Sequence, residues 1–233
     1  EIRAAGGEAV SSTHDITSWS GGEGLIALAV AELGGLDILV NNAGILRDRM
    51  LVSMSEQEWD DVVAVHLKGH FVPTRFAAAH WRERAKAGHE VRASVIHTSS
   101  TSGLLGNPGQ TNYGAAKAGI GAFSIICAQE LARYGVRSNC IAPAARTRLT
   151  EATPGLGEMV GAPAEGFDVW DPANVSPLVA YLATADCQIT GRTFFAQGGT
   201  VRVLEPWHLG ERLERDDRWT IDQLAEALPA ILG

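Results

Sequence analysis

Three side chains in one short stretch of the sequence could exchange a proton with a substrate. Ser100 ends an apolar run, Tyr113 follows a glycine-rich passage, and Lys117 comes four residues later. Residues four apart lie on the same face of a helix. A nearby ammonium favours the phenolate and so lowers the pKa of a tyrosine. The pair could therefore move a proton to or from an alcohol or carbonyl, although the spacing alone more often means a solvated lysine beside a packed ring.

The elements that must position these residues alternate between strands and helices. Helical spacing is expected at 18–33, from 56 to 80 behind the capping sequence SEQE, at 110–134, at 177–184 and after Thr220. Strands at this spacing indicate an α/β fold with a doubly wound parallel sheet and helices on both faces, in three layers. Ligands of such sheets meet the ends of the strands. The expected strands are 8–16, 36–44, 93–100, 138–142 and 192–199.

Composition narrows the class of protein. The 233 residues are 45% hydrophobic and 20% charged, which suits one domain with a sizeable core. A formal net charge of -8 argues against a nucleic-acid partner and against an anionic membrane surface. The cysteines are odd in number and far apart, which predicts buried thiols in a reducing compartment, by default the cytoplasm, and no metal site. They are Cys127, Cys140 and Cys187.

The joint pattern resembles the short-chain dehydrogenase/reductase (SDR) family over essentially the whole chain. Ser100 lies thirteen residues before Tyr113, N-N-A-G occupies 41–44 after one strand, and N-C-I-A-P occupies 139–143 in another. The resemblance implies a Rossmann-like fold in which Tyr113 is the general acid/base and Ser100 orients the substrate oxygen. It implies that Lys117 lowers the pKa of Tyr113 and binds the nicotinamide ribose of NAD or NADP.

The resemblance also implies the other contacts of that cofactor. For Asp15 the alternative is a helix N-cap or turn residue. The residues in NNAG are expected to brace the central strand as well. The matching positions are Asp15 and Ile16 near the adenine, Asn42, Ala43 and Gly44 along the adenosine side, and Pro143 and Thr147 beside the nicotinamide.

Several departures point to one branch of the family. His66 stands where the family usually has its fourth catalytic residue, an asparagine; the alternative is a hydrogen-bonded helix histidine without a catalytic role. The segments VHLKGHF, SSTSGLLGNPGQTNY and APAARTRLT resemble the (3R)-hydroxyacyl-CoA dehydrogenase and 17β-hydroxysteroid dehydrogenase type 4 branch. This implies acyl-CoA or steroid-like substrates, a slight preference for NAD, and a homodimer or homotetramer through helices 56–80 and 110–134.

One departure concerns the cofactor's pyrophosphate. The family binds it with a Gly-x-x-x-Gly-x-Gly turn after the first strand, and neither SGGEG at 20–24 nor GLLGNPG at 103–109 matches that context. We therefore expect a fold that lacks the first βαβ portion and is a fragment of a longer enzyme. The alternative is a truncated non-catalytic relative that serves as a dimerisation partner.

Three segments complete the expected organisation. Residues 1–200 form an N-terminally incomplete SDR domain, and 201–233 form an extension packed on the same domain. Residues 144–171 are rich in Gly, Pro, Ala and Thr with little periodicity. Such a composition favours an active-site lid, with an exposed surface loop as the alternative.

Overall fold

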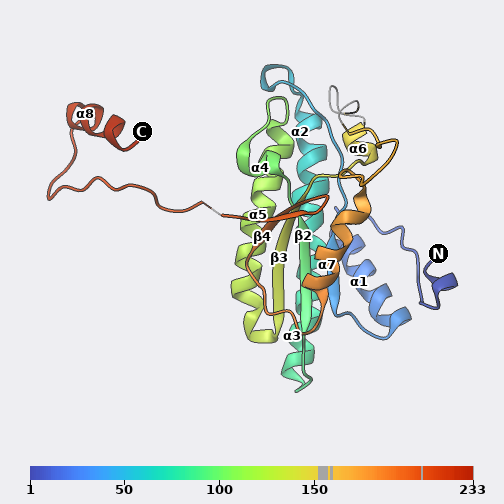
Figure 1. The fold of residues 1–233 in the computed structure, drawn as a ribbon. Helices are drawn as coiled ribbons and strands as arrows, with labels where there is room; N and C mark the ends of the chain where they lie inside the picture. The colour runs from blue at the N-terminus through green and yellow to red at the C-terminus, as the bar shows by residue number, and fades with distance from the viewer. Residues whose placement is uncertain (152–156, 158–159, 206, 233) are drawn as a thin grey trace.

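A five-stranded sheet forms the centre of the molecule in the computed structural model, which describes residues 1–151, 157, 160–205 and 207–232 (Figure 1). The strands lie in the order β1-β2-β3-β4-β5. The first four pair in parallel, and the last pairs antiparallel with β4. The bounds are β1 Ile38–Asn41, β2 Ala93–Thr98, β3 Val136–Pro143, β4 Thr193–Gln197 and β5 Thr200–Leu204.

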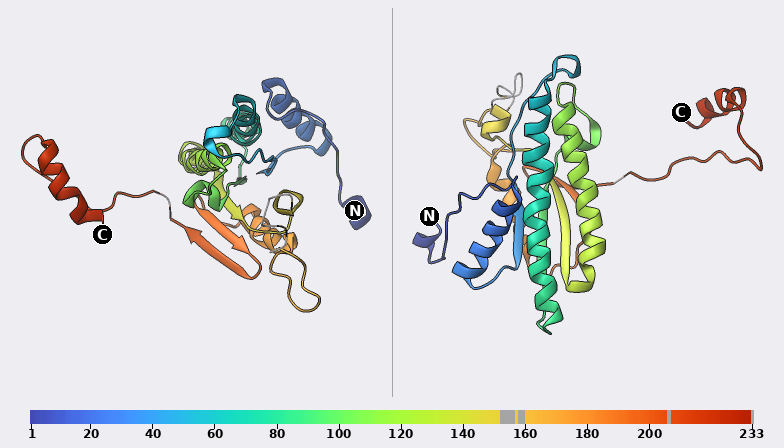
Figure 2. Two further views of the ribbon diagram at one scale, coloured as in Figure 1. Left: turned by 90° about the horizontal axis from the view of Figure 1, so that it is seen from above. Right: turned by 180° about the vertical axis from the view of Figure 1, so that it is seen from behind.

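Helices cover both faces of this sheet, so the three-layer α/β prediction is confirmed. Helices α1, α3 and α5 lie on one face, and α7 lies on the other (Figures 1 and 2). The α-helices are α1 Trp19–Leu33, α2 Glu56–Val63, α3 Gly69–Lys86, α4 Thr101–Leu105, α5 Thr111–Leu131, α6 Arg148–Glu151, α7 Ser176–Ala183 and α8 Ile221–Leu232; a π-helical turn at Ala64–Lys68 separates α2 from α3.

Alternation along β2 builds a separate core on each face. All six residues of β2 are buried. Val95 packs with Trp81 of α3 and Leu131 of α5 in one cluster, while Ile96 packs with Leu182 of α7 in the other. Because helices cover both faces of this parallel strand, its polar residues, such as His97, are buried as well as its apolar ones. The two cores hold β2 rigidly, and the site lies at its carboxyl end.

The helix ends follow the expected signals. The Ser18 side chain caps α1, which ends at Gly34 in the left-handed conformation. Ser55 and Glu58 form the predicted capping box, in which each side chain accepts a hydrogen bond from the other residue's main-chain N–H. These caps set where α1 and α2 begin.

Two strand predictions need correction. Residues 8–16 form no strand, because the described chain places no neighbouring strand to complete their hydrogen bonds. The strand at 192–199 is not the last, because Gly198 and Gly199 form a turn into β5. Gly198 has φ +53°, a conformation that glycine adopts without steric penalty.

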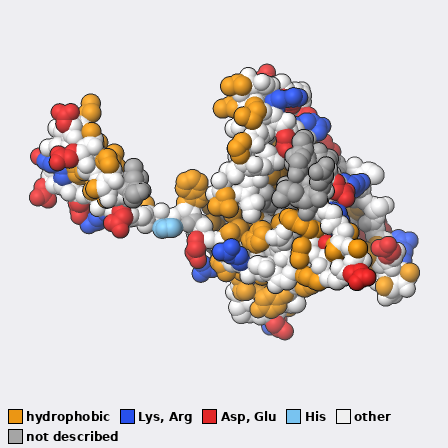
Figure 3. Space-filling model, turned by 45° about the horizontal axis from the view of Figure 1, so that its top comes forward, with side chains coloured by type: hydrophobic (Ala, Val, Ile, Leu, Met, Phe, Trp, Pro, Cys, Tyr) orange, Lys and Arg blue, Asp and Glu red, His pale blue; other side chains and the backbone are white. Residues whose placement is uncertain are grey.

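The C-terminal extension divides into two parts. Residues 200–204 join the sheet as β5, whereas α8 lies away from the body at the end of an extended segment (Figures 1 and 3). Trp207 is 90% exposed, and Ile221 at the start of α8 is 85% exposed. The structure therefore differs from the expected packing of this tail on the same domain, since the apolar side chains beyond β5 contact little of it.

The structure also shows the state of the cysteines and the length and character of the helices. All three cysteines are free and buried, as predicted. Among the described residues, none of the helices combines the length and apolar character needed to span a membrane.

Candidate active site

The end of β2 places the first candidate residue. The Ser99 N–H donates to the main-chain oxygen of Ile141 in β3 at 2.7 Å, which ties the chain to the sheet one residue past Thr98. Ser100 follows as the N-cap of α4, and its Oγ accepts from the N–H of Ser102 at 3.2 Å. The hydroxyl is thus held at the carboxyl edge of the sheet, where parallel sheets bind ligands.

Lys117 is buried beneath this edge. Its side chain rises from α5 with 2% exposure, and Nζ donates to the main-chain oxygen of Thr98 at 2.6 Å. Nζ lies 5.4 Å from the centre of the Tyr113 ring. Burial lowers the pKa of Lys117 to about 8, because an ammonium loses hydration inside the protein. The predicted pair is therefore assembled, with the ammonium anchored on a carbonyl oxygen.

The pKa of Tyr113 is raised above its ordinary value, in the direction opposite to the one expected from the Tyr–Lys pair. Burial is the largest cause. A hydrogen bond with Ser100 opposes it, and the charge of Asp48 adds to it. Tyr113 is therefore a neutral phenol at pH 7, in the state of an acid ready to donate to a carbonyl oxygen.

His66 contacts both the Tyr113 ring and the turn after β1. The two rings meet edge to face, with centroids 5.0 Å apart and an angle of 89°. His66 Nε2 lies 2.7 Å from the main-chain oxygen of Ile45 and 3.1 Å from its nitrogen. Burial, aided by the charge of Lys117, lowers the pKa of His66 to about 4. A neutral histidine in a π-helical turn, a feature frequent at functional sites, thus holds the backbone beside the tyrosine.

The N-N-A-G turn is fixed from two sides. Asn42 Oδ1 accepts from Thr98 Oγ1 at 3.0 Å, which links the ends of β1 and β2. A Cβ at Gly44 would lie 2.5 Å from His66 Cε1, so the close approach of this turn to the histidine requires glycine. Asn42 and Ala43 are exposed at the edge of the sheet, where a ligand can reach them.

Asp15 has a local structural role. Its Oδ1 accepts from the N–H of Thr17 at 2.9 Å and from Thr17 Oγ1 at 2.7 Å. These bonds lower the pKa of Asp15. The geometry fits the turn interpretation, while Ser18 is the N-cap. Ile16 is half-buried beside Gly69 of α3, and the adenine contact of both residues stays a prediction.

The chain after β3 forms the remaining side of the site. Pro143 ends β3, and Thr147 Oγ1 accepts from the N–H of Thr150 at 3.3 Å at the start of α6. Arg146 forms an ion pair with Asp168, and Arg146 Nη1 donates to the Val160 oxygen at 2.9 Å. This pair joins the two ends of the expected lid; residues 152–156 and 158–159 of that segment lie outside the described residues.

Sequence reasoning missed the polar residues whose hydrogen bonds position the start of α5. Gln110 Nε2 donates to Asp48 Oδ2 at 2.9 Å. Asn112 Nδ2 donates to the main-chain oxygens of Arg47 and Glu58, at 3.0 and 2.9 Å. Because Asn112 immediately precedes Tyr113, these bonds fix the position of the phenol. The signal was the polar Q-T-N triplet before the tyrosine in an otherwise small-residue stretch.

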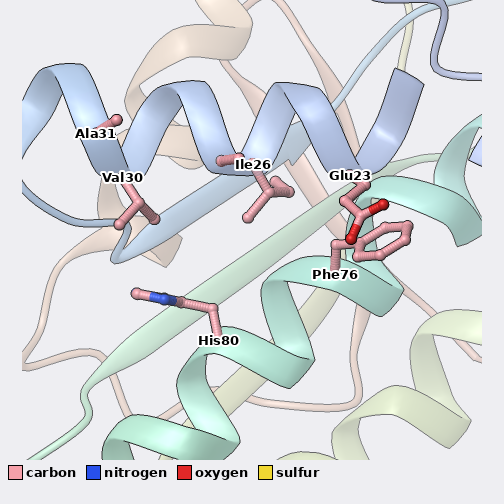
Figure 4. Close-up of a pocket in the computed structure, with 7 residues that line it drawn as sticks. Glu23, Ile26, Val30, Ala31, Phe76 and His80 are labelled. Atoms are coloured by element: carbon pink, nitrogen blue, oxygen red, sulfur yellow. The ribbon is translucent and has the colours of Figure 1, made fainter. Parts of the chain in front are cut away.

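A hollow between α1 and α3 lies away from this site. Its volume is about 370 Å³, and its walls come from α1 and α3 (Figure 4). Glu23 and Phe76 lie at one end, and Val30 and His80 at the other. None of the predicted site residues lines it, so the candidate site rests on the strand ends.

Comparison with known proteins agrees with this geometry. Residues 1–158 match the family model described as short chain dehydrogenase. The chain is 45% identical over 228 residues to hydroxyacyl-CoA dehydrogenase ChsB1 of Mycobacterium tuberculosis, an alignment covering 96% of this chain and 71% of that protein. It is 44% identical over 191 residues to peroxisomal multifunctional enzyme type 2 of Drosophila melanogaster, covering 82% of this chain and 29% of that enzyme.

A solved structure extends the likeness to three dimensions. The crystal structure of a short chain dehydrogenase from Mycobacterium avium superposes with a TM-score of 0.89 at 47% identity. The alignment covers 99% of this chain and 76% of that one. With the strand order, the seated Ser100, Tyr113 and Lys117, and the family match together, the chain belongs to the short-chain dehydrogenase family and is an oxidoreductase acting on CH–OH groups.

Proposed function

We propose that the protein interconverts a secondary alcohol and a ketone on 3-hydroxyacyl-CoA and 3-oxoacyl-CoA substrates with NAD or NADP as hydride carrier. The observation that carries this proposal is the assembly of Ser100, Tyr113 and Lys117 at the end of β2. The names of the similar proteins, hydroxyacyl-CoA dehydrogenase and peroxisomal multifunctional enzyme type 2, support the substrate class. Hydroxysteroids are the second substrate class to test.

The residues at the sheet edge fit the nicotinamide and ribose portions of such a cofactor. Lys117 Nζ has three N–H donors and gives one to Thr98 O, which leaves donors for ribose hydroxyls. Asn42 and Ala43 are exposed, and Asn42 bonds the side chain of the same Thr98. For the pyrophosphate, the described part of the chain contains no strand that leads into the family's glycine-rich turn. The described residues therefore fit the nicotinamide and ribose portions of the cofactor and supply no glycine-rich turn for its pyrophosphate.

The chain's own residues handle the proton. The bound cofactor would supply or accept the hydride. In ketone reduction, the neutral Tyr113 phenol gives its proton to the developing alkoxide while the Ser100 hydroxyl donates to the same oxygen. The Lys117 ammonium then stabilises the phenolate that remains. In alcohol oxidation the same proton moves back to Tyr113 oxygen. His66 holds the Ile45 backbone and the ring edge during both steps.

The direct test measures turnover of the chain. 3-Hydroxyacyl-CoA esters and a 3-hydroxysteroid are each offered with NAD and with NADP, and reduced cofactor is followed by absorbance. Oxidation of the acyl-CoA ester that disappears in Tyr113→Phe supports the proposal. Should the chain as printed be inactive, the assay is repeated with a family strand–turn–helix fused before Glu1. Absence of turnover with the fused version contradicts the proposal.

The competing interpretation is a non-catalytic relative that only dimerises. Exposed apolar side chains on α3 and α5, Phe71 at 41% and Ile126 at 50%, fit association through these helices. Titration with NADH and NADPH by fluorescence, together with sedimentation, separates the two. Saturable cofactor binding favours the enzyme, while a dimer that binds neither nucleotide favours the partner role. A cytoplasmic location and the choice between dimer and tetramer stay predictions.

A further inference from the structure

His70 is a buried residue that the catalytic description does not use. It lies in the first turn of α3 and is 1% exposed. Its Nε2 accepts from the main-chain N–H of Thr98 at 3.4 Å. The main-chain oxygen of the same Thr98 accepts from Lys117 Nζ at 2.6 Å. One strand-end residue thus separates the histidine from the ammonium.

Sheet geometry explains why Thr98 needs these two partners. The pairing of β1 with β2 ends at Asn41 and His97, one residue before Thr98. Successive residues of a strand direct their main-chain groups to opposite neighbours, and the Ser99 N–H donates to Ile141 in β3. The N–H and C=O of Thr98 therefore face the side of β1, where the ladder has stopped. His70 and Lys117 satisfy these two main-chain groups in place of a strand.

We propose that His70 is a positioning residue that acts through Thr98: by accepting the Thr98 N–H, it holds this residue so that the carbonyl oxygen keeps the Lys117 ammonium beside Tyr113. The importance of that placement for turnover rests on the function proposed above. The structural claim does not, because it concerns contacts within this chain.

The hydrogen bond from Thr98 indicates the tautomer of His70, and burial keeps its ring neutral. An accepting Nε2 carries a lone pair, so the ring proton sits on Nδ1. The ring stacks on His97 with centroids 5.8 Å apart and an angle of 25°, and Thr74 Oγ1 donates to the His70 main-chain oxygen at 2.7 Å. Burial, followed by the charge of Lys117, lowers the pKa of His70 to about 2. The imidazole therefore stays neutral and able to accept at any working pH.

Titration of Lys117 gives a test that needs no substrate. The chain has three lysines, Lys68, Lys86 and Lys117, so carbon-13 labelling of the lysine Cε gives three resonances, and Lys117→Arg assigns the one at issue. The groups facing Lys117 are Tyr113 on its own helix, His66 on the π-helical turn, His70 on α3 and Cys140 on β3.

His70→Leu removes the acceptor of the Thr98 N–H, so the carbonyl oxygen of Thr98 is no longer held toward Lys117 Nζ. A hydrogen bond to the ammonium favours its charged form, so the pKa of Lys117 should fall by roughly 0.5 to 1. His70→Gln, whose amide oxygen can accept the same N–H, should restore the wild-type titration. His80→Leu is the matched control, because it makes the same change ten residues along α3, at the hollow between α1 and α3. Unchanged Lys117 titration in His70→Leu overturns the proposal.

A measurement on the unaltered protein covers the case in which His70→Leu fails to fold. Long-range proton–nitrogen spectra distinguish the two tautomers of each histidine. His70 should carry its proton on Nδ1 and remain neutral down to pH 5. A proton on Nε2 would exclude acceptance from Thr98 and overturn the proposal without any variant.

Turnover adds a second readout where the protein is active. His70→Leu should lower kcat about tenfold, equivalent to about 1.4 kcal/mol of activation free energy, because Lys117 is then less well placed beside Tyr113, and it should change the KM of the acyl substrate less than twofold. His70→Gln should recover most of kcat. Equal losses in both variants, or a change confined to KM, would contradict positioning through Thr98. If the version with the fused strand–turn–helix also lacks activity, the function proposed above fails, while the titration of Lys117 still decides the role of His70.

Discussion

The rings of His66 and Tyr113 meet edge to face at 89°, while His66 Nε2 lies 2.7 Å from the main-chain oxygen of Ile45. One side chain therefore couples the turn after β1 to the phenol on α5. Because the pKa of His66 is lowered to about 4, this coupling persists in the neutral form throughout the physiological range. These contacts fit the interpretation of His66 as a hydrogen-bonded helix histidine, and a catalytic role for it stays a prediction.

Tyr113→Phe should nearly abolish turnover in an active form of the protein. The substitution removes the only hydroxyl of this side chain and keeps its ring, so kcat should fall by about 10² to 10⁴-fold, the usual contribution of general acid–base catalysis. The Kd of the cofactor, measured by fluorescence titration, should change less than twofold. An unchanged kcat would show that another group supplies the proton.

His66→Asn should retain substantial turnover, whereas His66→Leu should lose both the bond to Ile45 and the polar contact near Tyr113. We expect the leucine variant to be less stable by about 1–3 kcal/mol, because it leaves the Ile45 main chain without a partner. Chemical denaturation measures the stability difference. A loss of several orders of magnitude in kcat for His66→Asn would instead indicate direct proton transfer by the imidazole.

Gly44→Ala should destabilise the turn after β1. The added methyl would lie 2.5 Å from His66 Cε1, so either the turn or the histidine must move, at about 1–3 kcal/mol. Gly35→Ala is the matched control, since nothing lies within 4 Å of its added Cβ. Thermal unfolding compares the two, and equal melting temperatures would contradict the close packing of Gly44 on His66.

Stability should fall as the pH is lowered below about 6.5. The pKa values of His66, His70 and His97 are lowered from 6.5 to about 4, 2 and 3, mainly by burial. At pH values between the unfolded-state pKa of about 6.5 and the lower folded-state pKa, each histidine is protonated in the unfolded chain but not in the folded protein. The free energy of unfolding therefore rises with pH in this range. The slope approaches about 1.4 kcal/mol per pH unit for each histidine.

Urea unfolding between pH 5 and 7 measures this slope. His97→Asn removes one of the three histidines and should reduce the slope by up to about 1.4 kcal/mol per pH unit, the contribution of one proton. A wild-type protein whose stability is flat from pH 5 to 7 would show that these rings are hydrated or protonated in the folded state.

The sequence predicted the parts of the site that follow from strand ends and helix spacing. Ser100 comes after an apolar strand, and Tyr113 and Lys117 are four apart on a capped helix, so parallel pairing brings them to one edge. The structure confirms this placement. The same local reasoning identified α1 and α5 with little error in their bounds, whereas the single helix expected at 56–80 is divided by the π-helical turn into α2 and α3, and α3 ends at Lys86.

Other features depend on tertiary contacts that no local pattern encodes. The pKa of Tyr113 is raised because neighbouring elements bury it, and burial outweighs the hydrogen bond with Ser100. Residues 8–16 have a strand-like sequence, yet without a paired neighbour they remain irregular. His70 contacts Thr98 only because α3 crosses the end of β2, which spacing along the chain cannot show.

Lys117 Nζ donates to a main-chain oxygen, so this contact does not depend on the side chain at position 98. Thr98 binds Asn42 through its side chain but binds His70 and Lys117 through its backbone. Thr98→Val would remove the hydrogen bond to Asn42 in the turn after β1 and would leave the main-chain oxygen that accepts from Lys117 Nζ. Substitutions at position 98 that keep this backbone geometry are therefore expected to leave the contact with Lys117 in place.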